Sequence, residues 1–278
     1  MQATMQNRIL FIGAGNMATS LIGGLIANGT PAEAVCAADP NEEQLRKVAE
    51  QFGIRTTTDN SRAVDEADTV VLAVKPQVMA DVAKAIGAPA SNKSPLVISV
   101  AAGIREPDLR RWLGYDAAIV RTMPNTPALV QCGATALFGN EFVDDTARSM
   151  AEALMAAVGI CEWVDSEELL DAVTAVSGSG PAYCFLLMEL MTESGKKMGL
   201  SESLAMRLSQ QTMLGAATMA CQSPDSPSTL RQKVTSPGGT TERALEIFGE
   251  GAIEDLVEKA LKGAQLRAVE LGELLGGE

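Results

Sequence analysis

The sequence contains no histidine among its 278 residues, so it lacks the side chain that most often acts as a general acid or base near neutral pH. Its five cysteines are odd in number, widely spaced and without a Cys-x-x-Cys pair: Cys36, Cys132, Cys161, Cys184 and Cys221. This pattern argues against a zinc site or any other metal centre. We expect most of the cysteines to be small core residues kept as thiols in a reducing compartment. Catalysis must therefore rely on hydroxyls, backbone amides, water or a cofactor.

Aromatic residues and positive charges are also scarce. Aromatic residues make up 4% of the chain, so the core must be largely aliphatic. The 35 acidic and 22 basic residues give a formal net charge of −13, which argues against nucleic acid or an anionic membrane as a main partner. The most apolar late stretch, residues 181–191, is too short to span a bilayer and contains Glu189. Residues 1–8 lack a signal-peptide core, so we expect a cytoplasmic protein of bacterial type.

Strand and helix patterns alternate through the first part of the chain. Short apolar runs predict buried strands at residues 8–12, 35–38, 69–74 and 96–100, with further candidates at 117–121, 134–138 and 161–164. Helical patterns lie between them, for example at residues 18–27, 41–51 and 144–158. This alternation predicts an α/β domain over residues 1–165, with a doubly wound parallel sheet of the Rossmann type.

The second part of the chain, residues 166–278, reads as an all-helical domain. Helices are predicted at residues 181–198, 201–221, 228–234, 241–248 and 253–275. The run Tyr-Cys-Phe-Leu-Leu-Met at 183–188 has almost no polar face, and such a helix must be buried on all sides. We expect a second subunit to cover it, which makes this a dimerisation domain and the protein an obligate homo-oligomer. The alternative is a central helix wrapped by its own neighbours.

The motif Gly13-x-Gly15-x-x-Ala18 lies between the first strand and the first helix. In the dinucleotide-binding fingerprint the first glycine makes a tight turn, and the second lets the backbone approach the pyrophosphate. The small third residue lets helix and strand pack. We therefore predict cofactor contacts at Gly13, Ala14, Gly15, Asn16 and Met17. The alternative is a simple glycine turn.

Asp39, at the end of the second strand, bears on the choice of cofactor. An acidic residue here accepts hydrogen bonds from the ribose 2′-OH of NAD and repels a 2′-phosphate. Arg46 and Lys47 could offset that repulsion. Alternatively, Asp39-Pro40-Asn41 is only a turn that starts a helix. The cofactor prediction remains NADPH or NADH.

Several loops could carry chemistry beside the fingerprint. Lys75 follows a buried strand and would either contact a cofactor or simply reach solvent. Asn125 lies in the rigid loop 123–127 and could face a nicotinamide or substrate; alternatively, this loop is an ordinary connection. The loops 177–183 and 236–241 are rich in small residues and can present amides and hydroxyls to a carboxylate. Two such loops in one helical domain indicate an anionic small-molecule substrate.

Taken together, these motifs resemble the Δ1-pyrroline-5-carboxylate reductase family. The matching segments are 11–18, 73–77, 121–127, 177–183 and 236–241, and the resemblance extends from end to end of the chain. It implies NAD(P)H-dependent reduction of the cyclic imine Δ1-pyrroline-5-carboxylate to L-proline. It also implies a Rossmann domain followed by a helical domain that interlocks with a second subunit, in dimers that often assemble into decamers.

The resemblance further implies roles for individual residues. Asn60 would contact the adenosine ribose side of the cofactor, and Ala101, Ala102 and Gly103 would border the nicotinamide. The cofactor groove would be lined by Ala73, Val74, Lys75 and Pro76. The substrate pocket would be formed, partly across the dimer, by Ser177, Gly178, Ser236, Gly238, Gly239, Thr240 and Thr241. Thr241 would supply the catalytic hydroxyl that orients the imine nitrogen. Asp39 departs from members that carry a small polar residue at its position.

Two other functions remain open on the sequence. A β-hydroxyacid dehydrogenase relative would share the two-domain plan and would need a lysine positioned in the helical domain, for which Lys196 and Lys197 are candidates. A non-catalytic NAD-binding regulator would keep the Gly13 loop and lose the loop at 236–241, whereas both loops are intact here.

Overall fold

The computed structural model describes residues 7–277, so residues 1–6, where no signal-peptide core is expected, lie outside the described part. Its contacts divide the chain into two compact units. The first, here called the nucleotide unit, runs to Gly178 and also takes in the chain from Ala264 onward. The second, the helical unit, is Ser179–Gly263. This division differs from the expected boundary at residue 165.

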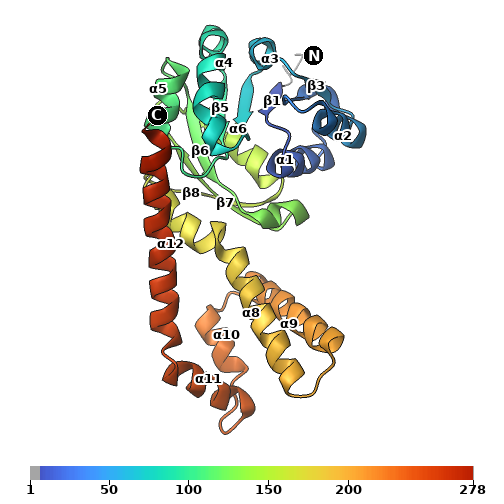
Figure 1. Cartoon of the computed structure of the whole chain (residues 1–278), viewed down its shortest axis with the longest axis vertical. Helices are drawn as coiled ribbons and strands as arrows, with labels where there is room; N and C mark the ends of the chain where they lie inside the picture. Colours follow the sequence, from blue (N-terminus) through green and yellow to red (C-terminus); the bar gives the residue numbers. More distant parts are fainter. Residues whose placement is uncertain (1–6, 278) are drawn as a thin grey trace. The chain divides into compact units, whose positions relative to one another are not determined.

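The nucleotide unit is built on one eight-stranded sheet, shown in Figure 1. The strands are β1 (Ile9–Ile12), β2 (Val35–Ala38), β3 (Arg55–Thr57), β4 (Thr69–Leu72), β5 (Leu96–Ser99), β6 (Ile119–Met123), β7 (Gly133–Gly139) and β8 (Gly159–Trp163). Their spatial order is β3-β2-β1-β4-β5-β6-β7-β8. The strand order reverses between β1 and β4, which confirms the doubly wound fold.

Two features of the sheet differ from the prediction. β7 runs antiparallel to β6, so the sheet is mostly rather than wholly parallel. The reason is the connection at residues 124–132, which is too short for a crossover back to the same end of the sheet. The edge strand β3 was not predicted, because Arg55 and Thr56 are exposed and give no apolar run.

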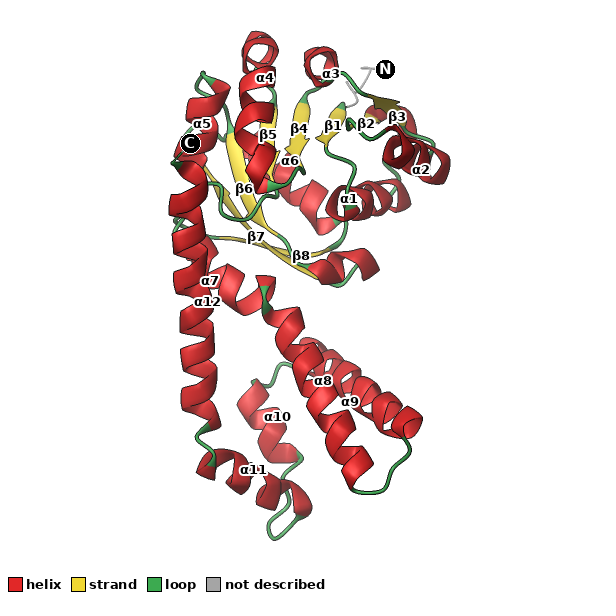
Figure 2. Ribbon diagram, in the orientation of Figure 1, coloured by secondary structure: helices red, strands yellow, loops and turns green. Residues whose placement is uncertain are grey.

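Helices cover both faces of the sheet, as Figure 2 shows with red helices around yellow strands. One core cluster involves α1 (Asn16–Ala27), α2 (Glu42–Phe52) and α6 (Asp145–Ala156). The other involves α3 (Asn60–Glu66), α4 (Met79–Lys93) and α5 (Glu106–Leu113). Strand β1 alternates between them, since Ile9 and Phe11 join the first cluster and Leu10 and Ile12 the second. Burial on both faces explains why this strand is a continuous apolar run.

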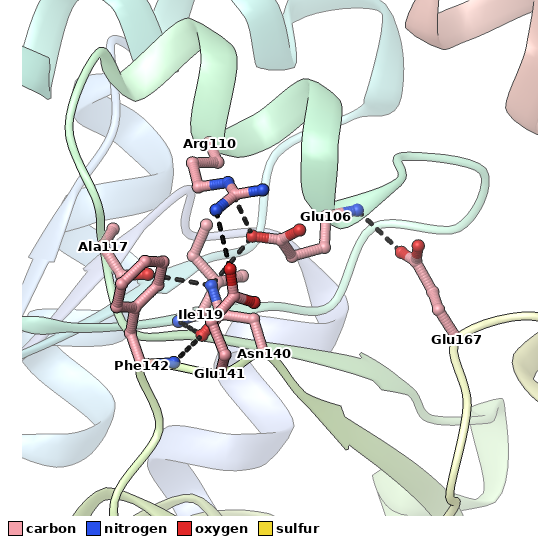
Figure 3. A network of polar contacts seen from close by, with 8 residues as sticks. All are labelled: Glu106, Arg110, Ala117, Ile119, Asn140, Glu141, Phe142 and Glu167. Atoms are coloured by element: carbon pink, nitrogen blue, oxygen red, sulfur yellow. Dashed lines mark hydrogen bonds and ion pairs between the residues drawn. The ribbon is translucent and has the colours of Figure 1, made fainter.

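A buried polar network centred on Asn140 joins the β6–β7 hairpin to α5 (Figure 3). The side-chain oxygen of Asn140 accepts hydrogen bonds from the amides of Ile119 (3.1 Å) and Phe142 (3.2 Å). Its Nδ2 donates to Glu106 Oε1 (2.8 Å) and to the carbonyl of Ala117 (2.9 Å). Burial raises the pKa of the Glu106 carboxyl above its ordinary value.

Contacts of residues 167–178 with the sheet explain why the nucleotide unit extends past residue 165. Glu167 Oε1 accepts a hydrogen bond from the backbone N–H of Glu106 (2.6 Å) and pairs with the buried guanidinium of Arg121 (3.0 Å). The short helix α7 (Leu169–Val173) follows, and its Asp171 forms a salt bridge with Arg105 (2.8 Å). These charged pairs cannot be read from apolar periodicity, on which the sequence boundary was based.

The helical unit contains no strand among the residues described, which confirms the all-helical prediction. Its elements are α8 (Gly180–Lys197), α9 (Glu202–Gln222), α10 (Pro227–Lys233), α11 (Thr240–Glu250) and the first part of α12 (Ile253–Gly276). Helices α8 and α9 pack side by side (Figure 1). Within the described part of the chain, no helix has the length and apolarity that crossing a membrane requires.

Helix α8 is not enclosed by its own chain. Phe185 is 63% exposed and Leu190 54% exposed, although both are large apolar side chains. The alternative of a central helix wrapped by its own neighbours is therefore wrong for the single chain. An apolar surface of this kind on a helical unit marks an interface with another protein molecule.

Candidate functional site

The dinucleotide loop begins where β1 ends, between the ends of β2 and β4. The amide of Gly13 donates to the carbonyl of Ala38 (2.7 Å), and Ala73 donates to the carbonyl of Ile12 (2.8 Å). Gly13 has a φ of +98°, and a Cβ there would lie 2.5 Å from the carbonyl oxygen of Ala73. Only glycine fits this position, which lies at the switch point where open α/β sheets bind ligands.

The N-terminus of α1 is available to an anion. Gly15 is the N-cap residue, it has no side-chain cap, and the first turn contains no acidic residue. A Cβ at Gly15 would meet no atom within 4 Å, so the space beside the backbone is open. The first amides of a helix lack intrahelical partners. The loop from Gly13 to Met17 therefore fits a dinucleotide pyrophosphate, as the sequence predicts.

Asp39 forms the predicted turn and also contacts the dinucleotide loop. Its Oδ1 accepts the amide of Asn41 (2.8 Å), which forms the turn that starts α2. Its Oδ2 accepts the amide of Ala14 (2.8 Å), so the carboxylate is fixed against the dinucleotide loop. Each oxygen retains a second lone pair that could accept a ribose hydroxyl. Gln44, which the sequence reading did not include, donates through Nε2 to the carbonyl of Ala14 (2.7 Å).

The basic residues near Asp39 are exposed on α2. Lys47 forms a salt bridge with Glu43 (2.7 Å), and both side chains are more than half exposed. A pair of this kind contributes little energy, so Lys47 remains free to exchange partners.

The remaining predicted cofactor residues follow the carboxyl ends of neighbouring strands. Asn60 is the first residue of α3, directly behind its cap Asp59. Residues Ala73, Val74, Lys75 and Pro76 follow β4, and Ala101, Ala102 and Gly103 follow β5. Lys75 is exposed and precedes a short 3-10 turn that starts at Pro76. The topology thus brings all of these positions to one edge of the sheet.

Asn125 is held by the backbone on both ends of its amide. It is 8% exposed, its Oδ1 accepts the amide of Ala134 (2.9 Å), and its Nδ2 donates to the carbonyl of Ser177 (3.0 Å). One Nδ2 hydrogen is left for a ligand. Asn125 therefore connects the loop after β6 to a π-helical turn, Thr174–Gly178. Single π turns are frequent at functional sites, and this one carries the predicted substrate residues Ser177 and Gly178.

The loop at residues 236–241 ends in the N-terminus of α11. Gly238 has a φ of +71°, and Gly239 is the N-cap residue without a side-chain cap. Thr240 and Thr241 lie in the first turn. Among the described residues neither threonine hydroxyl has a hydrogen-bond partner. Thr241 is therefore not the cap of its helix, and its hydroxyl is free to meet a ligand beside open amides.

Glu242 was missed by the sequence reading. Its carboxylate accepts a hydrogen bond from the amide of Gly238 (2.7 Å), four residues back in the chain. The signal was present, since a glutamate at the third helical position commonly reaches back to the residues before its helix. The contact orders the loop while leaving the first amides of α11 open.

The two candidate lysines of the helical unit, Lys196 and Lys197, are the last two residues of α8. Lys196 forms salt bridges with Glu193 (2.9 Å) and Glu202 (3.5 Å) at the end of α8. The hydrogen bond to Glu193 raises the pKa of Lys196, which keeps the amine protonated.

Comparison with known proteins gives two family-model matches. Residues 167–271 match the model described as pyrroline-5-carboxylate reductase dimerisation. Residues 8–103 match the model described as NADP oxidoreductase coenzyme F420-dependent. A pyrroline-5-carboxylate reductase of Pseudomonas aeruginosa is 53% identical over 97% of this chain and 98% of that protein. The chain belongs to the pyrroline-5-carboxylate reductase family.

Further members of the pyrroline-5-carboxylate reductase family agree in sequence and structure. The protein of Vibrio alginolyticus is 45% identical over 96% of this chain and 98% of its own length. A structure of the Coxiella burnetii reductase covers 96% of this chain and 98% of that one at 45% identity, with a TM-score of 0.93. The Plasmodium falciparum reductase, solved with NADP bound, covers 97% and 100% at 28% identity, with a TM-score of 0.84.

Proposed function

We propose that this chain reduces Δ1-pyrroline-5-carboxylate to L-proline with NADH or NADPH. The observation that carries the proposal is the uncapped N-terminus of α11, where open amides and two unbonded threonine hydroxyls adjoin one another. A carboxylate and an imine nitrogen on one small ring match that pair of groups. The glycine loop at Gly13 supplies the second requirement, a site for the dinucleotide, and relatives across the full chain carry this enzyme name.

The proposed mechanism assigns binding and orientation to the protein. The substrate carboxylate lies on the amides that follow Ser236, at Thr240 and Thr241 in the first turn of α11, because the amides of Gly238 and Gly239 already donate to Glu242 and to the carbonyl of Ser236. The hydroxyl of Thr241 orients the imine nitrogen and donates a hydrogen bond to it as the amine develops. The nicotinamide supplies a hydride when bound. Because a threonine hydroxyl is too weak an acid to protonate nitrogen by itself, the proton arrives with the substrate or from water that Thr241 holds.

The cofactor contacts in this proposal lie along one edge of the sheet. The amides from Gly13 to Met17 hold the pyrophosphate, and Asp39 and Asn60 face the adenosine ribose. The groove is lined by Ala73, Val74, Lys75 and Pro76, while Ala101, Ala102, Gly103 and the free hydrogen of Asn125 border the nicotinamide. Lys75 contacts the cofactor through its backbone. The Asp39 carboxylate accepts ribose hydroxyls from NADH and opposes the 2′-phosphate of NADPH.

The competing dehydrogenase activity has less support. That chemistry needs a lysine directed at the substrate, whereas Lys196 pairs with two glutamates at an exposed helix end. Turnover of a hydroxyacid in place of the imine would favour it.

We further propose that the protein acts as a homodimer through the helical domain, predicted over residues 166–278, and that dimers assemble into decamers. The matched dimerisation model and the exposed apolar side chains of α8 support the dimer. The net charge of −13 disfavours nucleic acid and membrane surfaces as partners. All five cysteines are free thiols, which fits a reducing cytoplasm, but none is buried in the single chain, so the expectation that most are core residues is wrong.

The direct test is the initial rate with pyrroline-5-carboxylate and each reduced cofactor, together with identification of proline as the product. We expect turnover with at least one cofactor. A folded oligomeric sample that oxidises neither NADH nor NADPH would exclude the proposed function.

A further inference from the structure

The C-terminal end of α12 packs against the loop that follows β5. Leu275 joins the core cluster on the α4–α5 face of the sheet. Gly103 has a φ of +76°, and a Cβ on it would lie 2.9 Å from Leu275 Cδ1 and 3.6 Å from Leu271 Cβ. The loop therefore adopts its left-handed turn directly beneath two leucines of α12.

A strip of small residues lets α12 approach α5 closely. Ala268, Gly272 and Gly276 are buried at intervals of four residues, so they share one face of the helix. A Cβ on Gly272 would lie 3.1 Å from Arg105 Nε, and one on Gly276 would overlap the carboxylate of Asp108. A larger side chain at Gly272 or Gly276 would have to displace the side chain of Arg105 or Asp108.

Charged groups fix the end of α12 in this position. Arg111 Nη2 donates to the carbonyl of Gly276 (2.7 Å), which satisfies an acceptor at the negative end of the helix. Arg105 packs beside Gly272 and forms a salt bridge with Asp171, a carboxylate that is only 3% exposed. The register of α12 on the nucleotide unit is thus defined by directional contacts as well as by packing.

The second half of the loop has few contacts of its own. Ala101 is buried in the core cluster, and its amide makes a long hydrogen bond to Ser99 Oγ (3.4 Å). Ala102 is exposed and Gly103 has no side chain, so these two residues offer few side-chain contacts that could hold the turn. The side chains of Leu271 and Leu275, which pack against Gly103 from α12, supply the contacts that hold the turn.

From these contacts we propose that the last two turns of α12 position the Ala101–Gly103 loop for the nicotinamide, with Leu275 and Arg111 as positioning residues. The proposal rests on the proposed function, which places this loop beside the nicotinamide. Neither residue touches the reacting atoms; both act through the backbone of the loop. A loop that is ordered before the cofactor arrives loses less conformational entropy when the nicotinamide half binds.

The test compares binding of NADH with binding of ADP-ribose, which lacks the nicotinamide, in the full-length protein without substrate. For Leu275→Ala we expect the Kd of NADH to rise about five- to tenfold while the Kd of ADP-ribose stays unchanged. Arg111→Gln should act in the same direction. Leu275→Met, which keeps the volume, should restore NADH binding. Leu274→Ala is the matched control, because Leu274 is 65% exposed on the same turn.

Each other outcome overturns the proposal. Equal losses for NADH and ADP-ribose would show that α12 only stabilises the fold, and unchanged values for both would show that the loop does not depend on it. Circular dichroism and the melting temperature identify a variant that fails to fold, and Arg111→Gln then carries the test. Wild-type protein that binds NADH but does not reduce pyrroline-5-carboxylate would contradict the proposed function alone.

Discussion

At the scale of single residues, substitution of Thr241 should affect catalysis most directly. Its hydroxyl has no partner among the described residues, and Gly239 rather than Thr241 is the helix cap. Loss of one well-placed hydrogen bond in the transition state costs about 10²–10³ in rate. Thr241→Ala should therefore lower kcat by about that factor, with little change in cofactor affinity, as measured by steady-state kinetics.

The controls for Thr241 separate catalysis from stability. Thr241→Ser should keep much of the activity, and Thr240→Ala should do less harm because that residue acts mainly through its backbone. Since neither threonine caps α11, the melting temperature should stay near the wild-type value. A Thr241→Ala enzyme with a lowered melting temperature and a normal kcat would contradict the catalytic role.

Asp39 makes the second residue-scale prediction, which concerns cofactor choice. Repulsion between its carboxylate and a 2′-phosphate amounts to about 1 kcal/mol when solvent screens the pair. Asp39→Ser should therefore lower the KM for NADPH about fivefold and leave the KM for NADH similar or higher. Asp39→Asn is the closer control for shape, because it removes the charge and keeps one acceptor oxygen. Unchanged KM values for both cofactors would show that Asp39 does not influence cofactor choice and only makes its two hydrogen bonds to the backbone.

At the scale of elements, the sequence predicted most strands and helices of the nucleotide unit. β1 and β4 are buried on both faces, so each one is a nearly continuous apolar run in the sequence. Asn41 and Gly53 mark the ends of α2, because Asn41 caps its N-terminus with a side-chain hydrogen bond and Gly53 adopts the left-handed conformation at its C-terminus. The sequence did not predict β3, because an exposed edge strand has no apolar signature. The antiparallel β7 was missed because strand direction depends on the connection and not on the strand itself.

The candidate site was predictable to a similar degree, and for similar reasons. The glycine positions follow from local backbone needs, such as the φ of +98° at Gly13. The contacts of Gln44 with Ala14 and of α12 with Gly103 join residues distant in the chain. No periodicity or motif encodes such tertiary contacts, so the structure was needed to find them.

The Asn140 network provides the element-scale prediction for stability. Asn140→Ala leaves the buried amide of Ile119 and the part-buried amide of Phe142 without this acceptor, and leaves the Glu106 carboxylate with the longer contact to Arg110 (3.4 Å). Buried groups that lose partners typically cost about 1–3 kcal/mol each, so we expect a loss of about 2–4 kcal/mol in the free energy of unfolding. Urea unfolding at fixed protein concentration measures it.

The control for Asn140 is an asparagine outside the core. Asn92 is exposed on α4, so Asn92→Ala should change the free energy of unfolding by less than about 0.5 kcal/mol. Equal effects at the two positions would mean that the network contributes nothing specific to the β6–β7 hairpin.

At the scale of the whole molecule, the apolar surface of α8 is the feature that a single chain leaves unexplained. Leu186 is 53% exposed and Leu187 45% exposed, on a helix whose sequence has almost no polar face. Exposure of such a surface to water is unfavourable. Burying it against a second copy contributes a favourable free energy of about 25 cal/mol for each Å² of apolar area removed from water. The match to a dimerisation model over residues 167–271 agrees with this interpretation.

Leu187→Asp therefore tests whether assembly is needed for activity. At a dimer interface the aspartate would be an unpaired charge removed from water, which costs several kcal/mol and should prevent assembly. We expect a monomer or an aggregate in size-exclusion chromatography with light scattering, and loss of turnover with it. Gln51→Asp adds the same charge at an exposed position of α2 and should leave both the oligomer and the activity intact. A soluble monomer with Leu187→Asp that kept wild-type activity would show that each chain completes its own site.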